Sequence, residues 1–239
     1  ENSSLLDLDI ELPSKNIKSN IYKGTISRVE PSLEAAFVNY GRTRHGFLPF
    51  KEILPDIFIP GKPKSARDCI ASGKEVVIQV DREERGTKGA ALSTYLSLAG
   101  KYLVLLPKNP NTGGISRRLE GYDRLKAKKL LDDINVPDNM SVILRTSGLD
   151  SSKESLEWDM NYLIQIFESI LESSVLKKAP YLIYEESSML ARVVRDYADD
   201  TIDEIIIDNE KFYNDFLNAK EHFIPHSKVK IEHYTKSVP

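Results

Sequence analysis

Five short stretches rich in β-branched and aromatic residues, separated by turn residues, fill the chain between residues 20 and 94. They run from Tyr22 to Val29, Leu33 to Tyr40, Gly46 to Pro49, Val76 to Asp81 and Ala90 to Thr94. Short strands at this spacing are typical of all-β units, in which a small sheet closes on itself to remove its edges. The sequence therefore predicts a small five-stranded barrel, with loops over 59–67 and 83–89.

The texture changes after Tyr95, where longer elements alternate. The pattern predicts strands at 102–106 and 140–146, a polar helix at 121–133 and a long amphipathic helix that begins at Ser151 and ends before Pro180. Ser151 and Glu154 have the spacing of a capping box, and apolar residues then recur at helical intervals. This part is expected to be mixed α/β.

The last third of the chain alternates strand and helix. Strands are predicted at 181–184, 204–208 and 229–234, and helices at 189–198 and 211–219. Such alternation favours βαβ units with a partly parallel sheet. A further apolar stretch, Leu5 to Ile10, has no hairpin partner beside it. We expect it to join the sheet of the tail, which makes the barrel an insertion in another domain.

Composition limits the class of protein. The formal net charge of −3 argues against a uniformly basic coat, so any nucleic-acid contact must be a local patch. The single Cys69 excludes an internal disulfide and a multi-cysteine zinc site. No apolar run reaches the roughly 20 residues of a membrane span, and the start is no signal peptide. We expect a cytoplasmic protein without membrane contact, cut from a longer chain because it starts at Glu1 and stops at Pro239.

Several long stretches resemble the ribonuclease E family. The stretches 20–24, 30–41 and 45–49 (NIYKG, EPSLEAAFVNYG and HGFLP) resemble its S1 RNA-binding domain. Residues 81–91, 97–100, 113–118, 145–146 and 207–209 resemble later parts of the same enzyme in the same order. The resemblance covers essentially the whole chain, and 44–49 (RHGFLP) favours the E type over the sister G type.

The resemblance implies a multidomain α+β fold. Residues 16–94 would form a five-stranded antiparallel OB-fold barrel of the S1 type. Residues 95–190 would form an α/β region that senses the 5′ end of RNA. Residues 1–15 and 191–239 would together form a ribonuclease H-like α/β scaffold into which the barrel is inserted.

The predicted RNA surface lies on the barrel. Strand alternation places Val38 and Phe37 on opposite faces, so a buried Val38 leaves Phe37 outside, where a base can stack on it. Phenylalanine is usually buried, so residue type alone favours the core for both Phe37 and Phe47. The resemblance favours the surface instead, with Lys88 beside the two rings. Further candidate RNA contacts are Lys23, Tyr40 and Arg85, with Arg42 and Arg44 as added positive charge.

The second predicted site binds a 5′ monophosphate. The resemblance assigns it to Gly100, Val104, Arg145 and Thr146. A guanidinium can grip a phosphate through two parallel hydrogen bonds, and a glycine leaves its N–H approachable. Val104 would support the terminal nucleotide. For Arg145 a surface salt bridge is the alternative. For Arg117 and Arg118 a further phosphate contact and a solvated loop remain equally open.

Catalytic and metal-binding residues are not expected within this chain. His45, His222, His226 and His233 lack metal-ligand spacing, and the acids at 199–200 and 203–204 flank element ends where solvated acids are common. In the family, magnesium is held by aspartates of a later DNase I-like domain, and a two-cysteine motif binds zinc between subunits. The resemblance thus implies both metals, and a homotetramer, for the full-length enzyme, but no cofactor here.

These observations favour the RNA-binding and 5′-monophosphate-sensing part of a single-strand-specific endoribonuclease of RNA decay and of ribosomal and transfer RNA processing. The alternative is a non-catalytic S1-type binding module of the translation or degradation machinery, which explains only the first half of the chain. A third reading, a scaffold whose barrel binds protein, predicts no steep salt dependence of RNA binding.

Overall fold

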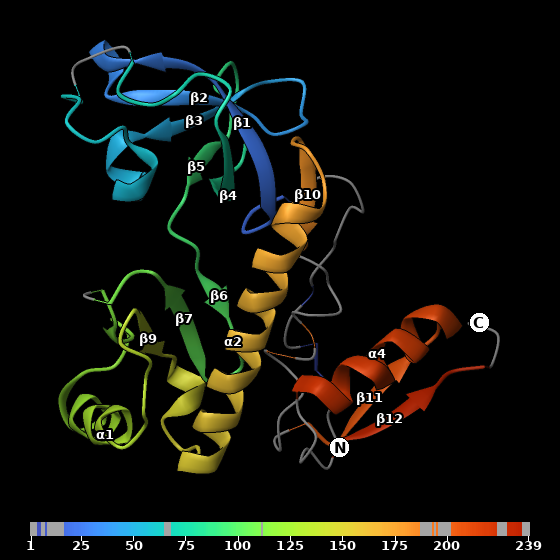
Figure 1. The fold of residues 1–239 in the computed structure, drawn as a ribbon. Coiled ribbons are helices and arrows are strands. Elements are labelled where there is room, and N and C mark those ends of the chain that lie inside the picture. Colours follow the sequence, from blue (N-terminus) through green and yellow to red (C-terminus); the bar gives the residue numbers. More distant parts are fainter. Residues whose placement is uncertain are drawn as a thin grey trace.

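The structure is a computed structural model that describes residues 4–5, 8, 17–64, 68–110, 112–186, 193, 195, 202–223 and 229–235. Figure 1 shows a barrel, a region in which two helices flank a small sheet, and a strand–helix–strand unit. The long helix α2 (Lys153–Leu176) runs from the second region to the barrel. The predicted α+β multidomain fold is confirmed. None of the helices in these ranges is both long and apolar enough to cross a bilayer.

The predicted five-stranded barrel is confirmed and is closed. Its strands are β1 (Ile21–Glu30), β2 (Ala35–Asn39), β3 (Gly46–Pro49), β4 (Glu75–Arg82) and β5 (Ala91–Ser93). They are hydrogen-bonded in the order β1-β2-β3-β5-β4, and β4 pairs back to β1. The closing pair of β3 and β5 is parallel, through Phe47 and Ala91, whereas the other pairs are antiparallel. The predicted OB-fold barrel is thus antiparallel in four of its pairs and closes through this one parallel junction.

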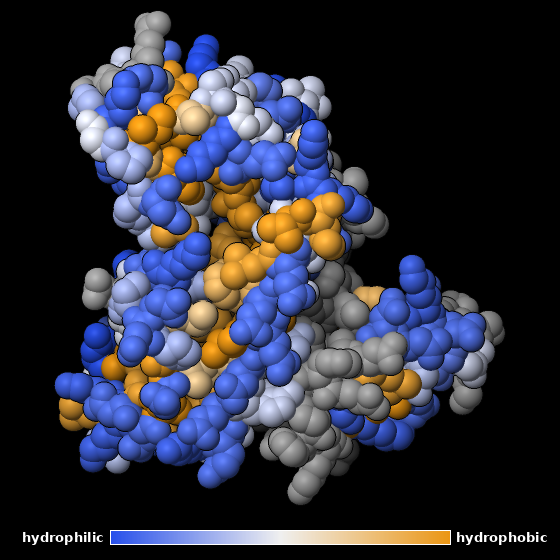
Figure 2. Space-filling view, in the orientation of Figure 1, coloured by the Kyte–Doolittle hydropathy of each residue, from blue (hydrophilic) through white to orange (hydrophobic). Residues whose placement is uncertain are grey.

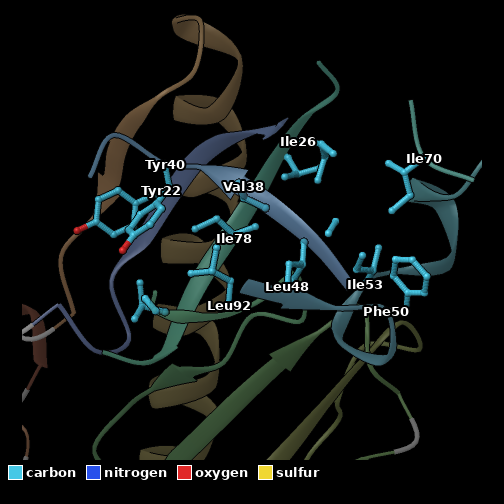
Figure 3. Packing of buried hydrophobic residues seen from close by; sticks show 14 of the residues in the cluster. Tyr22, Ile26, Val38, Tyr40, Leu48, Phe50, Ile53, Ile70, Ile78 and Leu92 are labelled. Atoms are coloured by element: carbon cyan, nitrogen blue, oxygen red, sulfur yellow. The ribbon is translucent and has the colours of Figure 1, made fainter. Parts of the chain in front are cut away.

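The core of the barrel follows strand alternation. Ala36 and Val38 on β2 point inward and are fully buried, as are Ile78 on β4 and Leu92 on β5. Figure 3 shows Val38, Ile78 and Leu92 side by side in this core. Cys69 is also buried there as a free thiol. Short 3-10 turns, η1 (Pro31–Leu33), η2 (Phe50–Glu52) and η3 (Pro55–Ile57), connect the strands or close the end of the barrel.

A sixth strand, β10 (Tyr181–Tyr184), lies at the edge of the barrel sheet. It follows α2 and pairs antiparallel with the first residues of β1, from Ile21 to Lys23. The strand itself was predicted, but its assignment to the sheet of the tail was wrong. Its apolar residues pack against α2 and the second region, because Ile183 and Tyr184 contact that core. Figure 2 shows hydrophobic residues gathered along this junction.

The second region is built on a four-stranded sheet in the order β6-β7-β9-β8. Its strands are β6 (Leu98–Ala99), β7 (Leu103–Pro107), β8 (Gly114–Ile115) and β9 (Met140–Leu144), and helix α1 (Gly121–Asp132) packs beside β8. Leu103, Leu105 and Leu144 from the sheet are fully buried against Leu156 and Leu163 of α2. This arrangement agrees with the predicted α/β texture.

The N-cap of helix α2 lies one residue later than predicted. Ser152, not Ser151, is the cap, because its hydroxyl accepts a hydrogen bond from the Ser155 N–H at 3.2 Å. The Ser151 hydroxyl instead donates to the Gly148 carbonyl at 2.7 Å and closes the preceding turn, η4 (Thr146–Gly148). Either of the two adjacent serines could cap the helix, and Ser152 does so because the hydroxyl of Ser151 is bonded within the preceding turn.

The third unit confirms the predicted parallel pairing. Strands β11 (Glu204–Ile207) and β12 (Lys230–His233) are parallel and are joined through α4 (Glu210–Phe223). Ile207, Phe216 and Val229 form its small core. Most of the predicted helix at 189–198 and nearly all of the stretch 1–16 lie outside the described residues, and so does the predicted insertion of the barrel. The domain boundaries therefore remain predictions.

Candidate nucleic-acid interface

Two phenylalanines, Phe37 and Phe47, lie side by side on neighbouring strands at the outer face of the barrel, and we call them the aromatic row. Phe37 on β2 is paired in register with Phe47 on β3. Their neighbours Ala36, Val38 and Leu48 are buried, so alternation turns both rings outward. The ring centroids are 5.9 Å apart with an interplanar angle of 70°, an edge-to-face contact. The structure thus places both rings outside the core, which a base-stacking platform requires.

A hollow of about 530 Å³ opens beside Phe37. It is lined by residues of β1, of β2, of the turn before β3 and of the hairpin between β4 and β5, namely Ser27, Arg28, Phe37, Arg44, His45, Thr87 and Gly89. The Arg28 guanidinium lies over the Phe37 ring, with its carbon 4.6 Å from the centroid. Sequence reasoning missed Arg28. Its signal, a basic residue in a predicted strand, does not by itself reveal which face it occupies.

The hairpin at 82–90 carries two more predicted contacts, Arg85 and Lys88, which are both exposed. Their backbones bridge each other. The Arg44 guanidinium donates to the Gly86 carbonyl at 2.5 Å and ties the hairpin to the turn before β3. Gly89 allows this approach, because a Cβ there would lie 2.2 Å from the His45 carbonyl oxygen. The fold therefore brings Lys88 to the side of the hollow.

Two predicted RNA contacts are corrected by the structure. Tyr40 is 1 % exposed and packs edge-on against Tyr22 in the barrel core. Its hydroxyl donates to Glu84 Oε1 at 3.3 Å, and burial raises the pKa of Tyr40 well above its usual value. Lys23 binds Glu75 Oε2 at 2.6 Å and the Lys177 carbonyl at 2.8 Å. Tyr40 thus cannot reach RNA, and Lys23 is occupied at the junction with α2.

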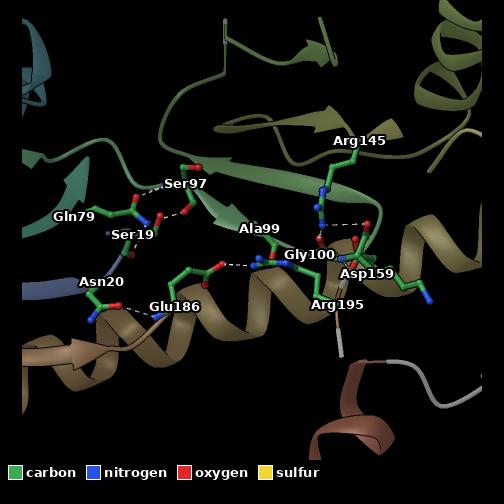
Figure 4. Close-up of polar contacts among 11 residues, drawn as sticks. Ser19, Asn20, Gln79, Ser97, Ala99, Gly100, Arg145, Asp159, Glu186 and Arg195 are labelled. Carbon is green, nitrogen blue, oxygen red and sulfur yellow. Dashed lines mark hydrogen bonds and ion pairs between the residues drawn. The ribbon is translucent and has the colours of Figure 1, made fainter. Parts of the chain in front are cut away.

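The predicted phosphate site brings together residues that are 45 positions apart. Arg145 follows β9, and its Nη1 donates to the Gly100 carbonyl at 2.5 Å and to the Lys101 carbonyl at 3.3 Å (Figure 4). The backbone N–H of Arg145 also donates to the Tyr102 carbonyl at 2.8 Å. Thr146 comes next and is exposed. The loop that follows β6 therefore fixes the orientation of the Arg145 guanidinium.

A buried carboxylate holds this loop. Asp159, on the apolar face of α2, accepts hydrogen bonds from the N–H groups of Lys101 at 3.0 Å, Tyr102 at 2.8 Å and Leu103 at 2.8 Å. Burial raises the pKa of Asp159, while these bonds and the positive charge of Arg145 oppose the shift. Sequence reasoning missed Asp159. An acidic residue between Leu156, Met160 and Leu163 was the available signal.

Gly100 has a different role from the one predicted. Its N–H donates to the Leu103 carbonyl at 2.8 Å and is not presented to a phosphate. A Cβ at this position would lie 2.5 Å from both carboxylate oxygens of Asp159. Glycine is therefore required because the loop passes directly over Asp159.

The remaining candidates lie around the same loop. Val104 is half-buried on β7 and pairs with Ala99 and Ile143. Arg117 and Arg118 are exposed, and the preceding Ser116 N–H donates to the Leu144 carbonyl at 2.9 Å. The backbone thus carries the two arginines to the end of β9, next to Arg145.

Polar side chains join the barrel to this loop. Gln79 on β4 donates to the carbonyls of Ser19 and Ser97 at 2.9 and 2.8 Å. Arg195 forms a buried ion pair with Glu186 at 2.7 Å and donates to the Ala99 carbonyl at 3.5 Å (Figure 4). Burial raises the pKa of Glu186, and Arg195 opposes it. Neighbouring carbonyls, of Ala99 and Gly100, thus hold one arginine each.

Within the described ranges no three His, Cys, Asp or Glu side chains cluster. His45 Nδ1 lies 2.9 Å from the Ser27 hydroxyl, and the His233 ring stacks on Tyr213. Asp199, Asp200 and His226 lie outside those ranges, and Glu204 pairs with Lys230 at 2.5 Å.

Comparison with known proteins yields two adjoining family matches. Residues 15–95 match the S1 RNA binding domain, and residues 97–239 match the ribonuclease E/G family. The chain is 52% identical over 224 residues to ribonuclease E of Haemophilus influenzae and 47% identical over 245 residues to that of Escherichia coli K12. These matches cover 91% and 98% of the chain but 24% and 23% of the relatives. Identity to Escherichia coli K12 ribonuclease G is 32%, over 98% of the chain and 50% of that relative.

Proposed function

Because the chain belongs to the ribonuclease E/G family and contains an S1 RNA-binding domain, we propose that it is the RNA-binding and 5′-monophosphate-sensing part of a single-strand-specific endoribonuclease. The higher identity to the E type than to the G type agrees with the motif at 44–49. The roles in RNA decay and in ribosomal and transfer RNA maturation, and a cytoplasmic location, belong to the same proposal.

Single-stranded RNA crosses the outer face of the barrel in this proposal. Bases stack on Phe37 and Phe47, and Lys88 and Arg85 attract the backbone from the hairpin. The net negative charge of the whole chain does not prevent RNA binding here, because basic side chains lie close to the two rings. The structural support is the outward position of both rings and the hollow next to them.

The 5′ phosphate docks at Arg145 and Thr146, and the orientation of Arg145 is the observation that carries this step. A guanidinium has five N–H donors in a fixed plane, and the carbonyls of Gly100 and Lys101 hold that plane in place. Such preorganisation lowers the entropic cost of binding. The Thr146 hydroxyl adds a hydrogen bond, Val104 supports the nucleotide, and Arg117 and Arg118 add positive charge.

The experiment compares dissociation constants for one RNA carrying either a 5′ monophosphate or a 5′ hydroxyl. We expect wild type to prefer the monophosphate. Arg145→Ala should weaken binding of the monophosphate form about ten- to a hundredfold and leave the hydroxyl form nearly unchanged. Arg145→Lys keeps the charge but not the planar fork and should recover part of the preference. Equal binding of both RNAs by wild type, or equal losses on both in Arg145→Ala, contradicts the sensing role.

We further propose that cleavage depends on residues outside this stretch. The chain spans about a quarter of the ribonuclease E relatives. Magnesium-dependent catalysis, structural zinc and a homotetramer are assigned to the rest of the enzyme. The purified chain with magnesium should therefore leave a susceptible oligonucleotide intact, and cutting that a substitution within the chain abolishes would overturn this part. A free-standing S1 module is disfavoured by the family match over 97–239.

A further inference from the structure

A β-bulge in β1 turns two consecutive side chains to the outside of the barrel. The pairing of β1 with β2 matches Ile26 with Val38 and then Arg28 with Phe37, so Ser27 is the additional residue. In a regular strand Ile26 and Arg28 would share a face. Here Ile26 is buried in the core, whereas Ser27 and Arg28 are both exposed. The bulge thus re-aims Arg28, a common use of this feature near functional sites.

The re-aimed arginine extends the aromatic row by one strand. The register places Arg28 opposite Phe37, Phe37 opposite Phe47, and Phe47 opposite Ala91. The guanidinium carbon lies 4.6 Å from the centroid of the Phe37 ring. A guanidinium plane supported by an aromatic ring is itself a surface on which an unpaired base can stack. The row therefore offers a third planar group at its β1 end.

The hollow next to Arg28 is lined by His45, whose imidazole forms a hydrogen bond with Ser27. The single hydroxyl proton of Ser27 is donated to the Phe37 carbonyl at 3.0 Å. His45 Nδ1 lies 2.9 Å from the same hydroxyl oxygen, and the tautomer that donates from Nδ1 allows both hydrogen bonds to form. In the neutral imidazole this leaves Nε2 as an acceptor. An acceptor suits the N–H on a base edge and repels a phosphate oxygen.

We propose that Arg28 is a base-stacking residue, and that the hollow beside it holds one unstacked base of single-stranded RNA whose N–H edge faces His45. The inference rests on the proposed function, because it requires RNA on this face of the barrel. Arg28 acts here through the plane of its guanidinium as well as its charge, whereas Lys88 and Arg85 are proposed to attract the RNA backbone through charge alone. The 530 Å³ hollow is within the size range of small-ligand sites.

The test uses Arg28→Lys, which keeps the charge and removes the plane. Binding of a 5′-hydroxyl oligouridylate should weaken about tenfold, the order of one lost base stack. Binding of an abasic oligonucleotide of the same length should not change. Arg82→Lys is the matched control, because Arg82 sits at the opposite end of the row, opposite Ala91, and pairs with Asp81 at 3.2 Å. We expect it to bind both probes as wild type does.

Each other outcome overturns the proposal. Unchanged binding by Arg28→Lys removes the stacking role, and equal losses on both probes indicate a phosphate contact. Equal losses in Arg28→Lys and Arg82→Lys show that the effect is not specific to the position beside Phe37. Failure of wild type to bind oligouridylate at all contradicts the proposed function itself.

A second variant tests the base edge. Wild type should bind oligouridylate more tightly than its N3-methylated form, which lacks the N3–H donor, and His45→Ala should remove the difference. Equal binding of both RNAs by wild type contradicts the edge contact.

Discussion

The aromatic row on the barrel and the arginine site of the second region are built in opposite ways. Phe37, Phe47 and Arg28 lie on the surface, and their positions are set by strand register and one bulge. Arg145 is held by loop carbonyls, and the loop is held in turn by the buried Asp159. The difference teaches where each site is vulnerable: substitutions in the row can lower RNA affinity without lowering stability, whereas the arginine site depends on a buried polar scaffold.

The largest effect is expected from Asp159→Ala. Three N–H groups lose their common acceptor in the interior, so the free energy of unfolding should fall by about 3–5 kcal/mol. Urea denaturation measures this loss, and Asp150→Ala, at an exposed acid before the same helix, is the control. A stable Asp159→Ala variant that still prefers 5′-monophosphate RNA would remove the contrast between the two sites.

The row should show the opposite behaviour. Phe37→Ala and Phe47→Ala should each weaken binding of single-stranded RNA by about 1–3 kcal/mol, the value of a base–aromatic stack. Unfolding should change little, because both rings lie outside the core. Fluorescence titration and urea denaturation of the same samples separate the two effects. A stability loss of several kcal/mol would show that the ring in question is part of the core.

Tyr40→Phe tests whether Tyr40 belongs to the core or to the RNA-binding surface. Only the hydrogen bond to Glu84 is removed, so stability should fall by about 0.5–1.5 kcal/mol. RNA affinity of the folded variant should equal that of wild type, because the ring is buried. A loss of RNA affinity without a loss of stability would return Tyr40 to the binding surface.

The smallest effect is expected from Lys23→Ala. Lys23 binds Glu75 and the Lys177 carbonyl at the junction of β1, β4 and α2. RNA affinity and its salt dependence should therefore match wild type, with only a slight shift of the urea midpoint. A shallower salt dependence in this variant would place a phosphate at Lys23 after all.

Strand alternation was enough to predict part of the barrel site. It places Phe37 outside once Val38 is inside, and the same alternation puts Tyr40 on the inner face with Val38, which the family resemblance obscured. Arg28 was beyond this reasoning, because one bulge reverses its face and a bulge has no clear signal in a single sequence.

The arginine site shows a different limit of prediction from sequence. Arg145 and Gly100 were assigned to one site only through the resemblance, because sequence spacing does not predict a contact between residues 45 positions apart. Asp159 stands in an apolar helical stripe, and its three partners lie 56 to 58 positions away. Strand β10 was predicted from its apolar residues. Its pairing with β1 was not predicted, because it depends on where the 24-residue helix α2 ends in space.

The pairing of β10 with β1 determines how portable the barrel is. The first residues of β1 are bonded to β4 on one side and to β10 on the other, whereas β2 pairs only from Thr25 onward. An excised piece ending at residue 95 would keep all five barrel strands but leave that edge of β1 open, and it would expose Ile21, which is buried in the core of the second region. Open strand edges recruit other strands. In this chain the segment up to residue 184 therefore covers one edge of the barrel, and we expect a piece that ends at residue 95 to be less stable than one that includes β10.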